Sequence, residues 1–215
     1  MDPGRIGPGH LEHLAAELLA FIKANPGWAM AVVAITAFGE SFAFLSLLFP
    51  GTAILVASGG LVQAGVIPFF STAIAGIIGG VLGDAISFWL GQKFGPVLPR
   101  MWPFARHPDM LGQGIGFFRR FGGASVFLGR FFGPLRAVVP VAAGILQMPA
   151  PYFYAANILS AIIWAPALIL SGQILTHSLL GGGRNIGEIA AIAGAAVVIA
   201  LVGYWARKRF APVRK

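Results

Sequence analysis

The sequence predicts an all-α protein that crosses a membrane several times. Of its 215 residues, 57% are hydrophobic and only 10% are charged, whereas a soluble domain carries roughly 25% charged residues. The mean hydropathy is +0.82, and several apolar runs approach the ~20 residues that a helix needs to cross a bilayer. The formal net charge of +8 does not indicate nucleic-acid binding, because the basic residues cluster in one linker and at the C-terminus.

The N-terminal segment predicts an amphipathic helix at the membrane interface. In the stretch HLEHLAAELLAFIKANPG, apolar residues recur every three or four positions, and the Asn-Pro-Gly sequence at 25–27 ends the helix. We therefore expect an interfacial segment over residues 1–26. A single membrane domain over 27–206 and a basic cytoplasmic tail over 207–215 follow.

Two of the apolar runs contain helix breakers and are predicted to be re-entrant hairpins. The run over about 41–64 contains Pro50-Gly51, and the run over about 124–147 contains Pro134 and Pro140. About four full transmembrane helices are expected in the other runs, which cover residues 28–39, 66–90, 152–175 and 189–206. Irregular backbone at membrane depth is tolerated where it is covered by protein or lines a cavity, so two facing hairpins are expected to meet.

Basic residues predict the orientation. The linker after Leu90 is basic and contains one acid, Asp109, and the tail contains no acid; both are expected to be cytoplasmic. Three apolar runs, an odd number, separate the linker from the tail, so one run must enter and leave on the same side. The run over 124–147 is the natural candidate, and the same argument applies to 41–64 if the N-terminus is also cytoplasmic. The result is an inverted repeat.

Four ionisable residues lie within or beside the apolar runs: Glu40, Asp84, Arg130 and Arg136. Each would cost about 2.5–3.5 kcal/mol at the centre of a lone transmembrane helix, so they are expected to be paired, hydrated or turned toward a cavity. One interpretation is two buried ion pairs that fix the hairpins. The other is a site in which the arginines hold an anionic headgroup, since guanidinium suits phosphate.

Cofactor and metal sites are not expected. The chain has no cysteine, and His10 and His13, three residues apart, lack a further ligand. No Ser–His pair lies at matching depth, so an enzyme is not expected either. Asp84 has a simpler alternative role, a polar contact inside the helix bundle.

Three motifs resemble the DedA family of membrane proteins, whose shared region is also called the SNARE-associated or VTT domain. They are GESFAFLSLLFPGTAILVASGGL, GDAISFWLGQKFG and FLGRFFGPLRAVVPVAAGILQM, and the resemblance covers about residues 25–175. It implies facing re-entrant hairpins, a bacterial plasma (inner) membrane location and the movement of lipids between leaflets. The family's essential acid and arginines correspond here to Glu40, Arg130 and Arg136. Many members have an acid directly after the PG pair, where this chain has Thr52.

The sequence and the resemblance together favour a lipid transporter that returns undecaprenyl phosphate to the cytoplasmic face. The alternatives are a phosphatidylethanolamine flippase or scramblase, and a proton-coupled transporter of a small solute or cation. A homodimer through the glycine-rich third run is a further expectation. The predicted substrate-binding residues are Arg130, Arg136 and Glu40, with Glu40 and Asp84 as candidates for proton coupling. The residues expected to shape the hairpins are Pro50, Gly51, Pro134, Pro140 and Gly144.

Overall fold

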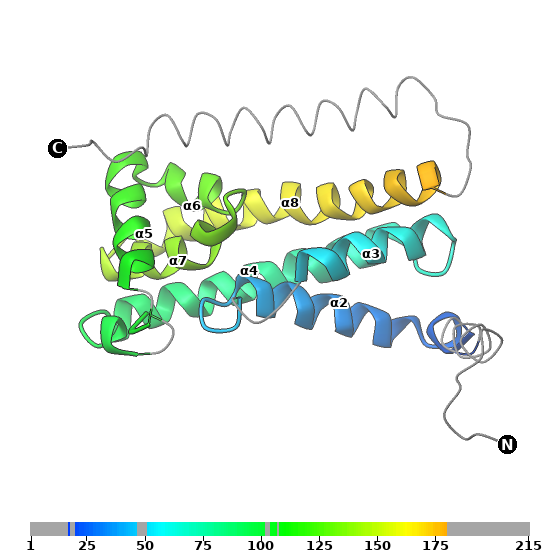
Figure 1. The fold of residues 1–215 in the computed structure, drawn as a ribbon, viewed down its shortest axis with the longest axis horizontal. Helices are drawn as coiled ribbons and strands as arrows, with labels where there is room; N and C mark the ends of the chain where they lie inside the picture. Colours follow the sequence, from blue (N-terminus) through cyan, green and yellow to red (C-terminus); the bar gives the residue numbers. More distant parts are fainter. Residues whose placement is uncertain (1–16, 18–19, 47–50, 102–103, 107, 180–215) are drawn as a thin grey trace, which may run out of the picture.

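The computed structural model describes residues 17, 20–46, 51–101, 104–106 and 108–179. These residues form helices and turns and no strand. The helices in chain order are α2 (Pro26–Ser41), α3 (Gly51–Gln63), α4 (Phe69–Phe94), η1 (Leu98–Arg100), α5 (Pro108–Phe121), α6 (Ala124–Gly129), α7 (Gly133–Ile145) and α8 (Ala150–Leu179). In Figure 1, α2, α3, α4 and α8 follow the long axis, while α5, α6 and α7 gather toward one end.

Two described helices, α4 and α8, are long and apolar enough to cross a membrane. They have 26 and 30 residues, or about 39 and 45 Å at 1.5 Å per residue. Large apolar side chains point outward along α4 at four-residue spacing, among them Phe70, Ile74, Ile78 and Leu82, each more than half exposed. A helix of a soluble protein usually turns its apolar residues inward and its polar residues outward. In α4 this arrangement is reversed.

The first break in the helical structure, called a chain break below, follows α2. This 16-residue helix ends at Ser41, and turns follow over 42–46. The amide of Ala43 donates to the Ser87 hydroxyl of α4 at 3.0 Å, which ties the turn to α4. The next described residue, Gly51, begins α3. The structure differs from the predicted hairpin of 41–64, because α3 is the only helix described wholly within that range and the preceding helix, α2, ends at its start.

The second chain break separates α6 from α7. Arg130, Phe131 and Phe132 form a turn between them, and Pro134 lies in the first turn of α7, where its missing amide hydrogen leaves no helical bond unmade. Pro140 differs from the prediction, since it lies inside α7 rather than at a break. Its ring nitrogen cannot bond the carbonyl of Arg136 four residues earlier, so one helical bond is lost while the helix continues.

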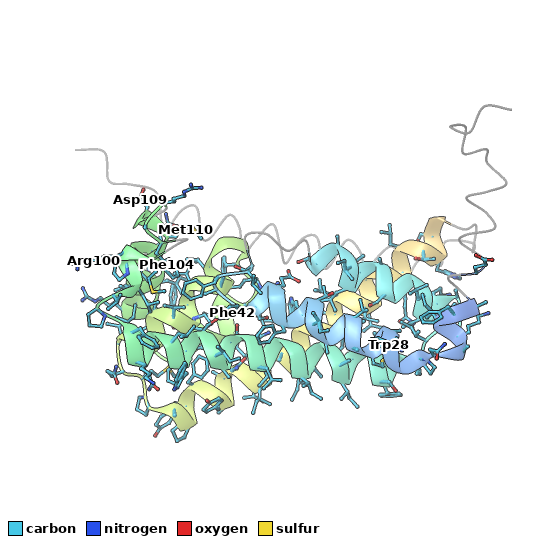
Figure 2. All side chains as sticks on the ribbon, turned by 90° about the horizontal axis from the view of Figure 1, so that it is seen from below. Trp28, Phe42, Arg100, Phe104, Asp109 and Met110 are labelled. Carbon is cyan, nitrogen blue, oxygen red and sulfur yellow. The ribbon has the colours of Figure 1, made fainter. Side chains whose placement is uncertain are left out.

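Helix α5 belongs to the basic linker and is amphipathic. Its buried residues Leu111, Gly114 and Phe117 are spaced three apart and face α6 and α7, while Arg119 and Arg120 are exposed. Arg100 and Asp109 lie at this end of the molecule and Trp28 at the opposite end (Figure 2).

Close helix approach depends on glycine. A Cβ on Gly144 of α7 would meet the Phe88 carbonyl of α4, and one on Gly91 of α4 would meet the Val141 carbonyl of α7. Gly144 therefore serves helix packing within α7, not the hairpin turn that was predicted for it. Gly59 of α3 and Gly172 of α8 form a second pair of this kind.

Several predictions fall outside the described residues. They include most of the N-terminal amphipathic segment, the last apolar run over 189–206 and the tail over 207–215. Residues 20–24 at the end of the N-terminal segment are helical. Of the four transmembrane helices expected, the described residues contain two that are long and apolar enough, α4 and α8.

Candidate functional site

The two chain breaks bring the four predicted charged residues together as two ion pairs. Glu40 is the penultimate residue of α2, Asp84 lies within α4, Arg130 follows α6, and Arg136 lies in the first turn of α7. Arg130 pairs with Asp84, and Arg136 pairs with Glu40 at 2.5 Å. The four side chains are between 2% and 10% exposed. The charges thus compensate one another in the protein interior.

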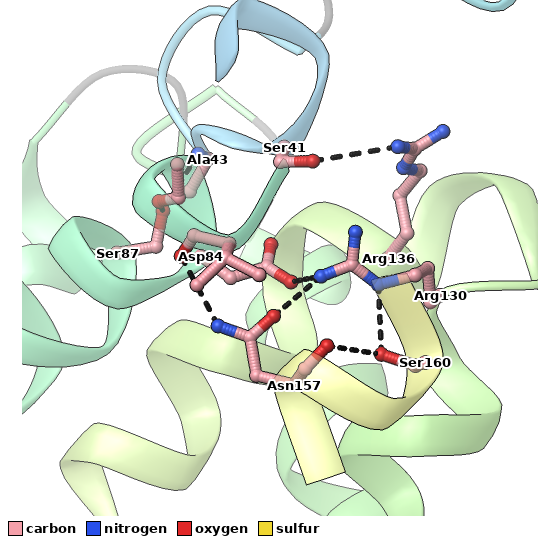
Figure 3. A network of polar contacts seen from close by, with 10 residues as sticks. Ser41, Ala43, Asp84, Ser87, Arg130, Arg136, Asn157 and Ser160 are labelled. Carbon is pink, nitrogen blue, oxygen red and sulfur yellow. Dashed lines mark hydrogen bonds and ion pairs between the residues drawn. The ribbon is translucent and has the colours of Figure 1, made fainter. Parts of the chain in front are cut away.

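Arg130 lies in a dense network of hydrogen bonds (Figure 3). Its Nε donates to Ser160 Oγ at 2.9 Å, and its Nη2 donates to Asp84 Oδ2 and to Asn157 Oδ1. The Asn157 amide in turn donates to the Val81 carbonyl of α4 at 3.1 Å. The network therefore joins the end of α6 to both long helices.

Arg136 is held differently. Its Nη1 donates to Glu40 Oε1, and its Nη2 makes a long contact of 3.4 Å with Ser41 Oγ. Its guanidinium carbon lies 4.4 Å from the centre of the Trp164 ring, within the range of a cation–π contact. The Thr52 hydroxyl, at the start of α3, donates to the same Glu40 oxygen. The ends of α2, α3 and α7 therefore meet at Glu40.

Two buried side-chain atoms of the described residues have no hydrogen-bond partner: Glu40 Oε2 and Arg130 Nη1. Most buried polar atoms in proteins do have one. The space beside Arg130 Nη1 is created by Gly80 of α4, where an added Cβ would lie 2.9 Å from Nη1, 3.4 Å from Trp164 and 3.6 Å from Ser41 Oγ. The network therefore keeps one unused donor and one unused acceptor.

The structure also places the predicted hairpin residues. Gly51 is buried, and its position leaves no room for a Cβ because of the Glu40 carboxylate. Pro134 lies in the first turn of α7, while Pro50 is outside the described residues. As described above, Pro140 and Gly144 lie within α7 and not at the break.

Three residues of α8 take part that the sequence analysis did not single out: Asn157, Ser160 and Trp164. They lie three and four residues apart and so share one face of α8. Two polar residues at that spacing within a run otherwise rich in apolar residues were a signal in the sequence. Among the described residues, no group of three His, Asp or Glu side chains is placed to hold a metal; His10 and His13 lie outside these residues.

Outward apolar stripes on helices of membrane-spanning length, with charged groups paired inside, are the features of a helical integral membrane protein. Residues 49–174, more than half of the chain, match the VTT domain. The chain belongs to the DedA family of membrane proteins, which carry this domain. The resemblance seen in the three sequence motifs is confirmed.

The chain is similar to membrane proteins of several bacteria. The chain is 33% identical over 194 residues to the inner membrane protein YabI of Escherichia coli, an alignment that covers 89% of this chain and 76% of YabI. It is 32% identical over 170 residues to an uncharacterized membrane protein of Buchnera aphidicola, covering 79% of this chain and 66% of that protein. It is 37% identical over 135 residues to the uncharacterized membrane protein Rv2637 of Mycobacterium tuberculosis, covering 59% and 62%. No solved structure matches the chain significantly.

Proposed function

We propose that the protein moves a lipid with an anionic phosphate headgroup between the two leaflets, and that Arg130 and Arg136 bind the phosphate. Undecaprenyl phosphate is the first candidate. The observation that carries the proposal is the buried, unpartnered Nη1 of Arg130, in the same polar cluster as a second arginine. A buried guanidinium donor without a partner costs free energy, and an anionic ligand would remove this cost by accepting a charge-assisted hydrogen bond from it.

The proposal includes two re-entrant hairpins that enter the membrane from opposite sides. With 16 and 13 residues, α2 and α3 are about 24 and 20 Å long, which is less than the ~30 Å hydrocarbon core. In the second pair, α6 has 6 residues and α7 has 13, so neither of these helices is long enough to span the core. In Figure 1 the α2–α3 pair approaches the middle from one end and the α6–α7 pair lies toward the other. Their breaks meet at the two ion pairs, as an inverted repeat would require.

The chemistry of the site suits a phosphate monoester. Two guanidinium groups offer planar donor forks to phosphate oxygens, and Glu40 and Asp84 act as counter-ions while no lipid is bound. The prenyl chain would remain against the apolar outer faces of α4 and α8, where Leu82, Leu159 and Ile163 are more than half exposed. The basic linker end, with Arg100 and Arg119, would face the cytoplasm.

One observation favours phosphatidylethanolamine as the second candidate. Glu40 Oε2 is buried and accepts no hydrogen bond, and an ammonium group has donors to supply. A headgroup with both charges would then use Arg130 Nη1 for its phosphate and Glu40 Oε2 for its amine. Glu40 and Asp84 are also the candidates for proton coupling, which would make exchange respond to a pH gradient.

The proposal is tested by leaflet exchange in proteoliposomes. Undecaprenyl phosphate and phosphatidylethanolamine are compared with and without a pH gradient, in wild-type protein, in Arg130→Ala and Arg136→Ala, and in Arg119→Ala as a control that removes an exposed arginine. We expect the wild-type protein to exchange one of the two lipids. Arg136→Ala should reduce the rate of this exchange at least about tenfold, because a charge-assisted contact is lost. Arg119→Ala should leave the rate unchanged. Wild-type vesicles that exchange neither lipid would overturn the proposal, and so would folded Arg130 and Arg136 variants that match the wild type.

A further inference from the structure

The two arginines of the site differ in what holds them. Arg130 has its three bonded acceptors on the two long helices, Asp84 on α4 and Asn157 and Ser160 on α8. The acceptors of Arg136, by contrast, are the neighbouring residues Glu40 and Ser41 at the end of α2. A movement of this one helix end would therefore release Arg136 and leave the bonds of Arg130 intact.

Burial and geometry point the same way. The Arg130 side chain is 2% exposed and that of Arg136 is 10% exposed. The Ser41 contact of Arg136, at 3.4 Å, is long for a hydrogen bond, so the Glu40 pair is the main polar attachment. The pair also lies beside a chain break, where α2 ends and turns follow, whereas Asp84 lies in the interior of a 26-residue helix.

Trp164 also contacts Arg136, and this contact does not depend on Glu40. The ring lies 4.4 Å from the Arg136 guanidinium carbon and 5.5 Å from that of Arg130. Trp164 itself is 5% exposed and packs in a core cluster with Val33, Leu55 and Ala75, on three different helices. The ring is thus fixed by apolar packing and would stay beside Arg136 after the ion pair opens.

We infer that the Glu40–Arg136 pair is the one that opens to admit the headgroup, and that Trp164 is a positioning residue that holds the freed Arg136 guanidinium in the site. The Asp84–Arg130–Asn157–Ser160 network stays closed and presents only Nη1 of Arg130. This inference rests on the proposed function, because the ligand that replaces Glu40 is the phosphate headgroup. It assigns a specific role to a tryptophan of α8 and distinct roles to the two arginines.

The first test compares Trp164→Phe with Trp164→Leu in the exchange assay. Phenylalanine keeps an aromatic face for the guanidinium and leucine does not. We expect Trp164→Leu to slow exchange by about 5- to 30-fold, the range that a desolvated cation–π contact supplies, and Trp164→Phe to keep most of the wild-type rate. Equal rates in the two variants would overturn the inference.

The second test keeps Trp164 and so does not depend on whether its variants fold. The chain has five tryptophans, and Trp28, Trp89, Trp102 and Trp205 are replaced by phenylalanine to leave Trp164 as the only one. Adding undecaprenyl phosphate in vesicles should change the fluorescence emission of Trp164 in a saturable way. The reason is that the neighbouring Arg136 guanidinium exchanges the Glu40 carboxylate for a phosphate. Vesicles with undecaprenol should give no change, and Arg136→Ala should abolish the response.

The outcomes separate the two proposals. If wild-type protein exchanges neither lipid, the proposed function fails and the inference falls with it. The other outcome is that wild-type protein exchanges lipid, Arg136→Ala does not, and undecaprenyl phosphate leaves the Trp164 emission unchanged. In that case the proposed function stands, and the opening of the Glu40–Arg136 pair beside Trp164 is refuted.

Discussion

Replacing Asp84 by asparagine should strongly destabilise the protein, because Arg130 would lose its counter-ion. The Arg130 side chain is 2% exposed and that of Asp84 is 7% exposed, so water cannot solvate the positive charge that Arg130 would retain. Asparagine is nearly the same size and can still accept from Nη2, and the Ser160 and Asn157 bonds remain. The change therefore isolates the charge rather than the packing.

The magnitude follows from the burial of the pair. Breaking a buried ion pair from one side costs about 3–5 kcal/mol. For a chain of this size, each kcal/mol shifts the melting temperature by roughly 2–4 °C, so we expect Asp84→Asn to lower it by about 6–20 °C. The assay is thermal unfolding of the purified protein in a mild detergent, followed by the far-ultraviolet circular dichroism signal of the helices.

Two further variants make the reasoning refutable. Asp109→Asn applies the same chemical change to an exposed acid of α5 and should shift the melting temperature by no more than about 2 °C. The double variant Asp84→Asn with Arg130→Gln removes both charges and should recover at least half of the loss, since a neutral pair leaves no uncompensated charge. If Asp84→Asn melts with the control, or if the double variant is less stable than Asp84→Asn, the argument from charge compensation is wrong.

Three other predictions concern packing, the chain break and the membrane face. Gly172→Ala should destabilise the protein by about 1–3 kcal/mol, because the added Cβ would meet the backbone of α3. Gly112→Ala has no atom within 4 Å of the added Cβ and should stabilise α5 by up to ~1 kcal/mol. Thermal unfolding of the two variants measures both effects. Thr52→Val removes a donor to Glu40 and should cost about 1 kcal/mol, and denaturant unfolding with an unchanged m-value would measure it. Ile78→Asp places a charge on the outer stripe of α4 and should cost about 2.5–3.5 kcal/mol on insertion, seen as less protein in the membrane fraction than for Ile78→Leu; equal amounts would refute a lipid-facing stripe.

The sequence predicted the long helices well because the signal for them is local. Apolar runs over 66–90 and 152–175 correspond to α4 (Phe69–Phe94) and α8 (Ala150–Leu179), whose ends lie within a few residues of those bounds. Hydropathy and length are properties of a contiguous segment, and a membrane selects for both directly. The second broken segment, predicted over 124–147, corresponds to α6 and α7 for a similar reason, since a turn precedes Pro134.

The positions of the breaks were less predictable. Proline marks a possible break, but whether the helix stops depends on its neighbours. Pro140 stays within α7, where Gly91 and Gly144 allow α4 to pack closely against the helix. The break occurs instead over residues 130–132, between α6 and α7, and the Arg130 side chain reaches α4 and α8 from this turn. The sequence predicts a separate span over residues 28–39, since these residues are as apolar as their neighbours. The structure places them in α2, which ends beside the first break.

The sequence alone determined the class of protein, its family and the four charges that must be accommodated, because composition, motifs and the energetic cost of charge in an apolar run are all visible in one dimension. Only the tertiary structure decided which acid pairs with which arginine, that Asn157, Ser160 and Trp164 complete the site, and that one donor and one acceptor remain unused. The physical reason is range. Ion pairs and cation–π contacts act over a few ångströms, and Glu40 and Arg136, 96 positions apart, come within that distance only when the helix ends have packed.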